Sequence, residues 1–186
     1  NQAKSAKGNP MSNAATSSDV RPPARANQFY PGNPNEMVRA IDQHLATAGK
    51  VTVRPYRAVM LPHAGWIFCG DTLAKTIARV TVPDLAIIIG PKHTSYGPPL
   101  SIAPHRSWQI PGATVPVAHD WARRLAELAP QFELEPDAHG MEHGSEVIVP
   151  FLYRINRNVT VLPIVIGGVN YNVADELATA IATLGN

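Results

Sequence analysis

Two of the most apolar runs in this 186-residue chain each end in a short turn that carries a histidine. Residues 57–61 lead into Pro62-His63-Ala64-Gly65, and residues 85–89 lead into Gly90-Pro91-Lys92-His93. Continuous apolar runs of this length are typical of parallel strands buried on both faces. Open α/β sheets bind their ligands beyond the carboxyl ends of such strands. The pattern therefore predicts an α/β fold with both histidines at one sheet edge.

The remaining periodicity predicts helices between these strands and a third strong strand. Apolar residues at three-to-four spacing predict helices from Pro34 to about residue 49 and over residues 73–80, 121–128, 145–156 and 173–184. Residues 159–166 read as the third strand, closed by Gly167-Gly168. Between residues 101 and 117 short apolar pieces alternate with prolines, which favours edge strands over a place inside the central sheet.

Length and composition indicate one domain. At 45% hydrophobic residues the chain is long enough to bury a single core, and we expect this domain over residues 21–186. Residues 1–20 are rich in Ser, Asn, Ala and Lys without periodicity, so they predict a disordered tail.

Charge and cysteine content argue against several classes of protein. The net charge is only +2 and no basic run is interleaved with aromatic residues, so we expect no nucleic-acid partner. No apolar stretch approaches the roughly 20 residues that cross a bilayer, and no signal peptide is recognisable. Cys69 is the only cysteine, which excludes an internal disulfide and fits a reducing compartment. These features predict a soluble cytoplasmic protein without a membrane partner.

The paired histidines His63 and His93 predict a metal site. A neutral imidazole is a common ligand of zinc, iron and copper, and it also serves as a general base near neutral pH. Neighbouring strands lie about 4.8 Å apart, so both side chains could reach one point above the sheet edge. Either histidine alone could merely hydrogen-bond its turn, but the repetition of the pattern favours two metal ligands.

A third polar cluster spans residues 138–146. It contains His139, Glu142, His143 and Glu146, and glycines at positions 140 and 144 argue against a continuous helix and against the zinc-protease motif. We expect Glu146 in the first turn of a helix, where the helix dipole favours a carboxylate. His143 would then act as an acid or base, with Glu146 orienting it. The alternative is a helix-capping network without chemistry.

Several other side chains allow two interpretations. Cys69 reads as a small buried residue in preference to a ligand. Lys92 could meet an anionic substrate or lie in solvent. Tyr30, Trp66 and Tyr96 could line a pocket or pack in the core.

Six segments together resemble the MEMO family, whose bacterial members are also called AmmeMemoRadiSam system protein B. In chain order they are Phe29-Tyr30-Pro31, Pro62-His63-Ala64-Gly65-Trp66, Gly90-Pro91-Lys92-His93, Ala138-His139 with Glu142-His143 and Glu146, Pro150-Phe151-Leu152, and Pro163-Ile164-Val165-Ile166-Gly167. The resemblance spans about residues 21–184. It implies a three-layer α/β/α fold with a mostly parallel central sheet, similar to class III extradiol dioxygenases.

The resemblance also implies a mononuclear non-heme site that binds iron or copper, with zinc in some preparations. His63 and His93 match two metal-binding histidines of the family, and His143 matches a histidine close to the site. Family chains continue with a Ser-Ser-Asp segment that carries another histidine and, in some members, a cysteine ligand, so the third ligand has no counterpart before Asn186. The family usually has serine after the histidine, whereas Gly144 stands here and Ser145 follows.

Three functions fit these expectations. The first is an iron- or copper-dependent oxidoreductase related to dioxygenases, acting on a small molecule, with His63 and His93 as ligands and with His143 and Glu146 as catalytic residues. The second is a non-enzymatic module that binds a peptide or phosphopeptide in the same cleft. The third is a structural remnant or partner subunit. The oligomeric state is not indicated by the sequence.

Overall fold

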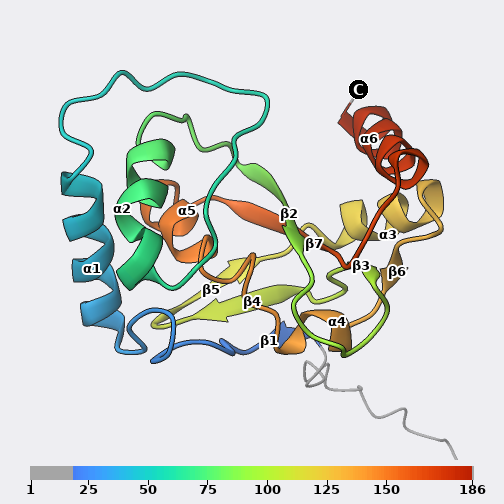
Figure 1. Cartoon of the computed structure of the whole chain (residues 1–186), viewed down its shortest axis with the longest axis horizontal. Helices are drawn as coiled ribbons and strands as arrows, with labels where there is room; N and C mark the ends of the chain where they lie inside the picture. The colour runs from blue at the N-terminus through green and yellow to red at the C-terminus, as the bar shows by residue number, and fades with distance from the viewer. Residues whose placement is uncertain (1–18, 186) are drawn as a thin grey trace, which may run out of the picture.

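The computed structural model describes residues 19–185, which form a mixed α/β structure as predicted (Figure 1). None of the helices in this range is long and apolar enough to cross a membrane. The helices are α1 (Pro34–Ala46), α2 (Trp66–Ile77), α3 (His119–Leu128), α4 (Asp137–Gly140), α5 (Val149–Ile155) and α6 (Tyr171–Gly185). The strands are β1 (Val20–Arg21), β2 (Leu85–Pro91), β3 (Leu100–Ile102), β4 (Ser107–Ile110), β5 (Ala113–Pro116), β6 (Glu133–Leu134) and β7 (Thr160–Ile166).

The described strands form two sheets. The larger has the order β2-β7-β3-β6, in which β2 pairs parallel with β7 and β3 pairs parallel with β6, while β3 and β7 are antiparallel. The smaller has the order β1-β4-β5 and contains the β4–β5 hairpin. The two longest strands, β2 and β7, are the apolar runs that the sequence predicted, and they lie in register from Leu85 opposite Thr160 to Pro91 opposite Ile166.

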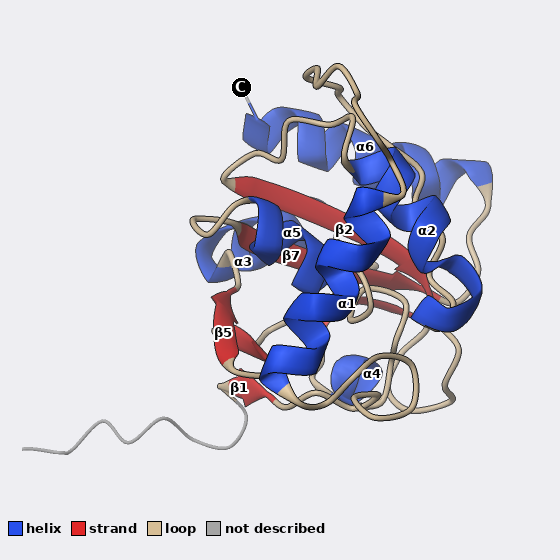
Figure 2. Cartoon of the chain, turned by 90° about the vertical axis from the view of Figure 1, so that its left-hand side faces the viewer, coloured by secondary structure: helices blue, strands red, loops and turns tan. Residues whose placement is uncertain are grey.

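Helices cover β7 on both faces. Val161 packs in one apolar cluster together with Ile41 of α1, Leu73 of α2 and Phe151 of α5. Leu162 and Ile164 pack in a second cluster with side chains of α3 and α6. In Figure 1 α1, α2 and α5 accordingly lie on one side of the β2–β7 pair, with α3 and α6 on the other, and Figure 2 shows α1 and α2 in front of these strands. This two-sided burial explains why β7 is a continuous apolar run.

The predicted strand over residues 57–61 does not form. Residues 55–65 contain no strand and follow the long connection between α1 and α2 (Figure 1). Met60 is 92% exposed despite its apolar side chain. An apolar run becomes a strand only when a neighbouring strand pairs with its backbone, and no described strand pairs with this one. The prediction of two adjacent strands that both end in a histidine is therefore wrong, and β2 is an edge strand.

Three further boundaries differ from the prediction. The helix expected over residues 73–80 begins earlier, at Trp66, and ends at Ile77. β3 lies between β7 and β6, so residues 100–102 belong to the larger sheet and only the β4–β5 hairpin matches the expected excursion. The helix expected from residue 145 begins at Val149, after a series of turns. Of the predicted tail, residues 1–18 lie outside the described range. Val20, also predicted to be disordered, belongs to β1 and pairs with Ser107 of β4.

Candidate metal centre

Three histidines from distant parts of the chain lie together beyond the end of β2. The ring centroids of His63 and His93 are 5.2 Å apart, and those of His63 and His143 are 6.2 Å apart. His93 and His143 are stacked at 4.1 Å with an interplanar angle of 27°. The two histidines that the sequence paired therefore lie close to each other, although only His93 follows a strand.

The backbone on either side fixes the positions of His93 and His63. Lys92 N donates to Ile166 O at 2.9 Å, which continues the β2–β7 ladder up to the residue before His93. For His63, the nearest backbone anchor is Trp66, three residues later at the start of α2. Trp66 N donates to Phe29 O at 2.8 Å. The indole of Trp66 also donates to Val147 O at 2.9 Å, which connects α2 to the segment that follows His143.

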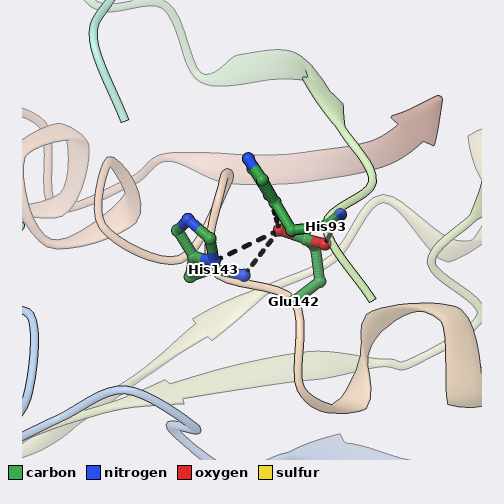
Figure 3. A group of neighbouring side chains, drawn as sticks. All are labelled: His93, Glu142 and His143. Carbon is green, nitrogen blue, oxygen red and sulfur yellow. Dashed lines mark hydrogen bonds and ion pairs between the residues drawn. The ribbon is translucent and has the colours of Figure 1, made fainter. Parts of the chain in front are cut away.

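A buried carboxylate, Glu142, joins two of the three histidine segments. Its Oε1 accepts hydrogen bonds from His93 Nδ1 at 2.7 Å and from His143 N at 2.8 Å (Figure 3). The same oxygen accepts a third from Gly144 N at 3.0 Å. Its Oε2 accepts one from His93 N at 2.6 Å. Burial alone would raise the pKa of Glu142, but these hydrogen bonds lower it to about 2. The carboxylate is therefore charged near neutral pH.

The surroundings of His63 and His143 favour the neutral imidazole. Burial lowers the pKa of each ring, and the neighbouring His93 lowers both further. His143 also packs against Phe29, with ring centroids 4.6 Å apart, and its Nδ1 is 3.6 Å from Glu142 Oε1, which is too long for a hydrogen bond. A neutral imidazole keeps a lone pair that a metal ion or a proton can take.

The spacing of these groups suits a metal ion. The ligand atoms that His93, Glu142 and His143 offer all lie within 4.8 Å of one another. The His63 ring lies beside this group, as its distances to the other two rings show. Cys69 is buried in α2, where its Sγ contacts Ala64 O at 3.2 Å, so the interpretation as a small buried residue is correct.

Glu146 does not contact His143 as the sequence analysis expected. Its carboxylate oxygens accept hydrogen bonds from Ala24 N, Arg25 N and the Tyr30 hydroxyl at 3.0, 2.8 and 2.7 Å. Its Oε2 also lies 2.6 Å from Arg21 Nη1. Because α5 starts only at Val149, Glu146 occupies a turn and faces the N-terminal segment. The carboxylate that orients an imidazole of the cluster is Glu142.

The remaining side chains that the sequence singled out lie outside the histidine cluster. Tyr30 and Trp66 are buried core residues with ring centroids 5.1 Å apart, and burial together with the Glu146 carboxylate raises the pKa of Tyr30. The Lys92 ammonium donates to Thr94 O. Tyr96 is exposed.

Arg21 is a buried residue that the sequence analysis missed. Its Nε donates to His139 O at 2.9 Å and its Nη2 donates to Glu142 O at 2.6 Å, while its guanidinium lies 4.3 Å from the centre of the Trp108 ring. Arg21 thus holds the backbone of the Glu142 segment from the side of the smaller sheet. A single arginine before two prolines carries no sequence signal for this role.

The fold and the histidine cluster define a mixed α/β protein with a candidate metal site at the end of a parallel strand. The chain belongs to the family described as Memo-like protein, whose model matches residues 21–185. The resemblance seen in the sequence is thereby confirmed.

Individual relatives give the same result. The chain is 33% identical over 158 residues to a MEMO1 family protein of Aquifex aeolicus, covering 84% of this chain and 58% of the relative. It is 35% identical over 159 residues to one of Ignicoccus hospitalis, covering 78% of this chain and 56% of the relative. It is 31% identical over 179 residues to a MEMO1 family protein of Methanobrevibacter smithii, covering 89% of this chain and 64% of the relative. The chain therefore spans less than two thirds of the length of these relatives.

Proposed function

We propose that this domain is a mononuclear non-heme metal protein in which His63 and His93 are ligands of iron or copper. The observation that carries the proposal is the 5.2 Å separation of the two imidazole rings, which come from segments 30 residues apart in the chain. Imidazole nitrogen suits iron and copper, and it also suits zinc, which would compete for the same donors. The lowered pKa of His63 supports this role, because a ligating imidazole must be neutral.

Within this proposal the chain positions the donors and supplies a proton carrier. Glu142 accepts a hydrogen bond from Nδ1–H of His93, which leaves the other ring nitrogen free to bind. His143 is stacked on His93, so it can take or give a proton at a substrate held beside both rings. A bound iron or copper ion would supply the one-electron chemistry of an oxidoreductase, and we place the substrate among small molecules. The free thiol of Cys69 is compatible with the cytoplasm as the site of this activity.

The metal content of purified protein tests the ligand assignment. Protein prepared without chelator should carry iron or copper, and the variants His63→Ala and His93→Ala should each lose most of it. His119→Ala is the matched control, because His119 lies in α3 and outside the cluster. Equal metal content in all four proteins would contradict the proposal.

An activity assay separates the enzyme from the binding module. Oxygen consumption with catechol-like or thiol substrates that disappears after metal removal supports the oxidoreductase. Saturable binding of a peptide or phosphopeptide that survives metal removal would favour the module instead.

A further inference from the structure

Glu142 could bind the metal directly, because its carboxylate lies within 4.8 Å of the donor atoms of His93 and His143. We propose instead that Glu142 is a positioning residue that holds His93 in the Nδ1–H tautomer and so directs Nε2 to the metal. This inference rests on the proposed function in one respect only, namely that His93 is a ligand.

The hydrogen bonds of Glu142 leave no capacity for a metal ion at Oε1. A carboxylate offers about four lone-pair sites, two on each oxygen, and Oε1 receives three donors while Oε2 receives one. Oε1 is the oxygen nearest the imidazoles, and its donors from His93 and His143 are drawn in Figure 3. Coordination through Oε1 would break bonds to two backbone N–H groups, and their loss in a buried setting is costly.

The same contacts determine where the proton of His93 lies. Three of the four donors are backbone N–H groups, so the Glu142 carboxylate acts as an acceptor throughout. The short contact between Oε1 and His93 Nδ1, at 2.7 Å, then requires the proton on Nδ1. Figure 3 shows the second ring nitrogen of His93 pointing away from the carboxylate. A carboxylate partner of this kind fixes the orientation of a ligating histidine and raises its basicity.

The position of Glu142 is itself set by its neighbours. Its side chain is 1% exposed, and its backbone carbonyl accepts the hydrogen bond from Arg21 at 2.6 Å. Through His93 N the carboxylate also fixes the backbone of a loop 49 residues away in the chain. Glu142 therefore fixes the ring orientation of His93, its tautomer and the backbone of its loop.

The tautomer of His93 can be measured without any metal. In the ¹⁵N-labelled full chain treated with chelator, long-range ¹H–¹⁵N NMR spectra distinguish Nδ1–H from Nε2–H imidazoles, and the His93→Ala variant assigns the signal. We expect His93 in the Nδ1–H form near neutral pH. An Nε2–H form would overturn the inference, whether or not the protein binds metal.

A metal titration then tests the consequence. Second-sphere carboxylates typically contribute about 10–100-fold to metal affinity, so Glu142→Gln should weaken Co²⁺ binding by this factor and change the tautomer populations of His93. The exposed Glu133→Gln in β6 is the matched control and should change neither quantity. Co²⁺ binding by Glu142→Gln as tight as in the parent protein would overturn the inference.

Two outcomes keep this inference apart from the proposed function. If the parent protein fails to bind Co²⁺ while His93 is in the Nδ1–H form, the metal proposal fails and Nε2 is directed to no metal, but the control of the His93 tautomer by Glu142 stands. If Glu142→Gln does not fold, the tautomer of the parent protein decides alone.

Discussion

Arg21 and Glu146 form an ion pair in which each side chain is only 1% exposed. Two charges removed from water require good geometry and further hydrogen bonds. Glu146 meets this requirement with two backbone N–H groups and a tyrosine hydroxyl, and Arg21 does so with two backbone carbonyls. The pair therefore fastens the N-terminal segment to the segment that carries Glu142 and His143.

Removal of this arginine should be strongly destabilising. Arg21→Met leaves Glu146 buried without its cation, and such a loss lowers the free energy of unfolding by about 3–5 kcal/mol. Arg154→Met is the matched control, because Arg154 pairs with Asp42 at an exposed site, where about 1 kcal/mol or less is expected. Urea denaturation measures both values, and similar losses in the two variants would contradict the role given to Arg21.

Two phenylalanines on different helices test how each helix is buried. Phe151 of α5 is fully buried, whereas Phe68 of α2 is 84% exposed. Phe151→Ala should lower the free energy of unfolding by about 3–5 kcal/mol, because it removes core contacts and leaves a cavity. Phe68→Ala should change it by no more than about 0.5 kcal/mol. A large loss in the Phe68 variant, seen by the same denaturation assay, would show that this face of α2 is covered in solution.

Strand β2 should show alternating protection of its backbone amides. Thr160 N donates to Asp84 O and Lys92 N donates to Ile166 O. Since alternate residues of a strand face the same neighbour, Ile88 and Gly90 donate toward β7, while Ile87 and Ile89 face the open edge. Hydrogen exchange followed by NMR should therefore be faster at Ile87 and Ile89 than at Ile88 and Gly90. Equal protection would mean that another segment pairs with this edge.

Acid should destabilise the whole molecule, because two histidines are buried in it. Burial lowers the pKa of His139 to about 3 and that of His105 to about 4, and the charge of Arg21 contributes to both shifts. The unfolded chain binds these protons near pH 6.5, whereas the folded state binds them only below about pH 4. The unfolded state therefore holds more protons in this window, and stability decreases as the pH falls through it.

The free energy of unfolding of chelator-treated protein should accordingly decrease steadily from about pH 6.5 to pH 4. His139→Gln should flatten this dependence, whereas His119→Gln should leave it unchanged. Urea titrations at several pH values provide the measurement. A profile that is flat between these values in the parent protein would refute the assignment of the two histidines as buried neutral groups.

Local patterns were sufficient for the elements whose side chains follow a clear period. The sequence predicted β2 and β7 from their apolar runs, and α1, α3 and α6 from their amphipathic spacing. Burial of one face or of both faces produces a pattern of apolar residues that can be read locally. The run at residues 57–61 is also mostly apolar but lacks a pairing partner among residues 19–185, so composition alone was misleading there.

The sequence by itself determined strands β2 and β7, helices α1, α3 and α6, and the three histidines of the candidate site, His63, His93 and His143. Only the tertiary structure decided that Glu142, and not Glu146, forms a hydrogen bond with an imidazole of the cluster. It also decided that Arg21 contacts both the Glu142 backbone and the Glu146 carboxylate. The physical reason is distance along the chain. Periodicity reports contacts within a few residues. The His93 ring that Glu142 contacts lies 49 positions away, and the partners of Glu146 lie more than 100 positions away, so these contacts form only when the whole fold has packed.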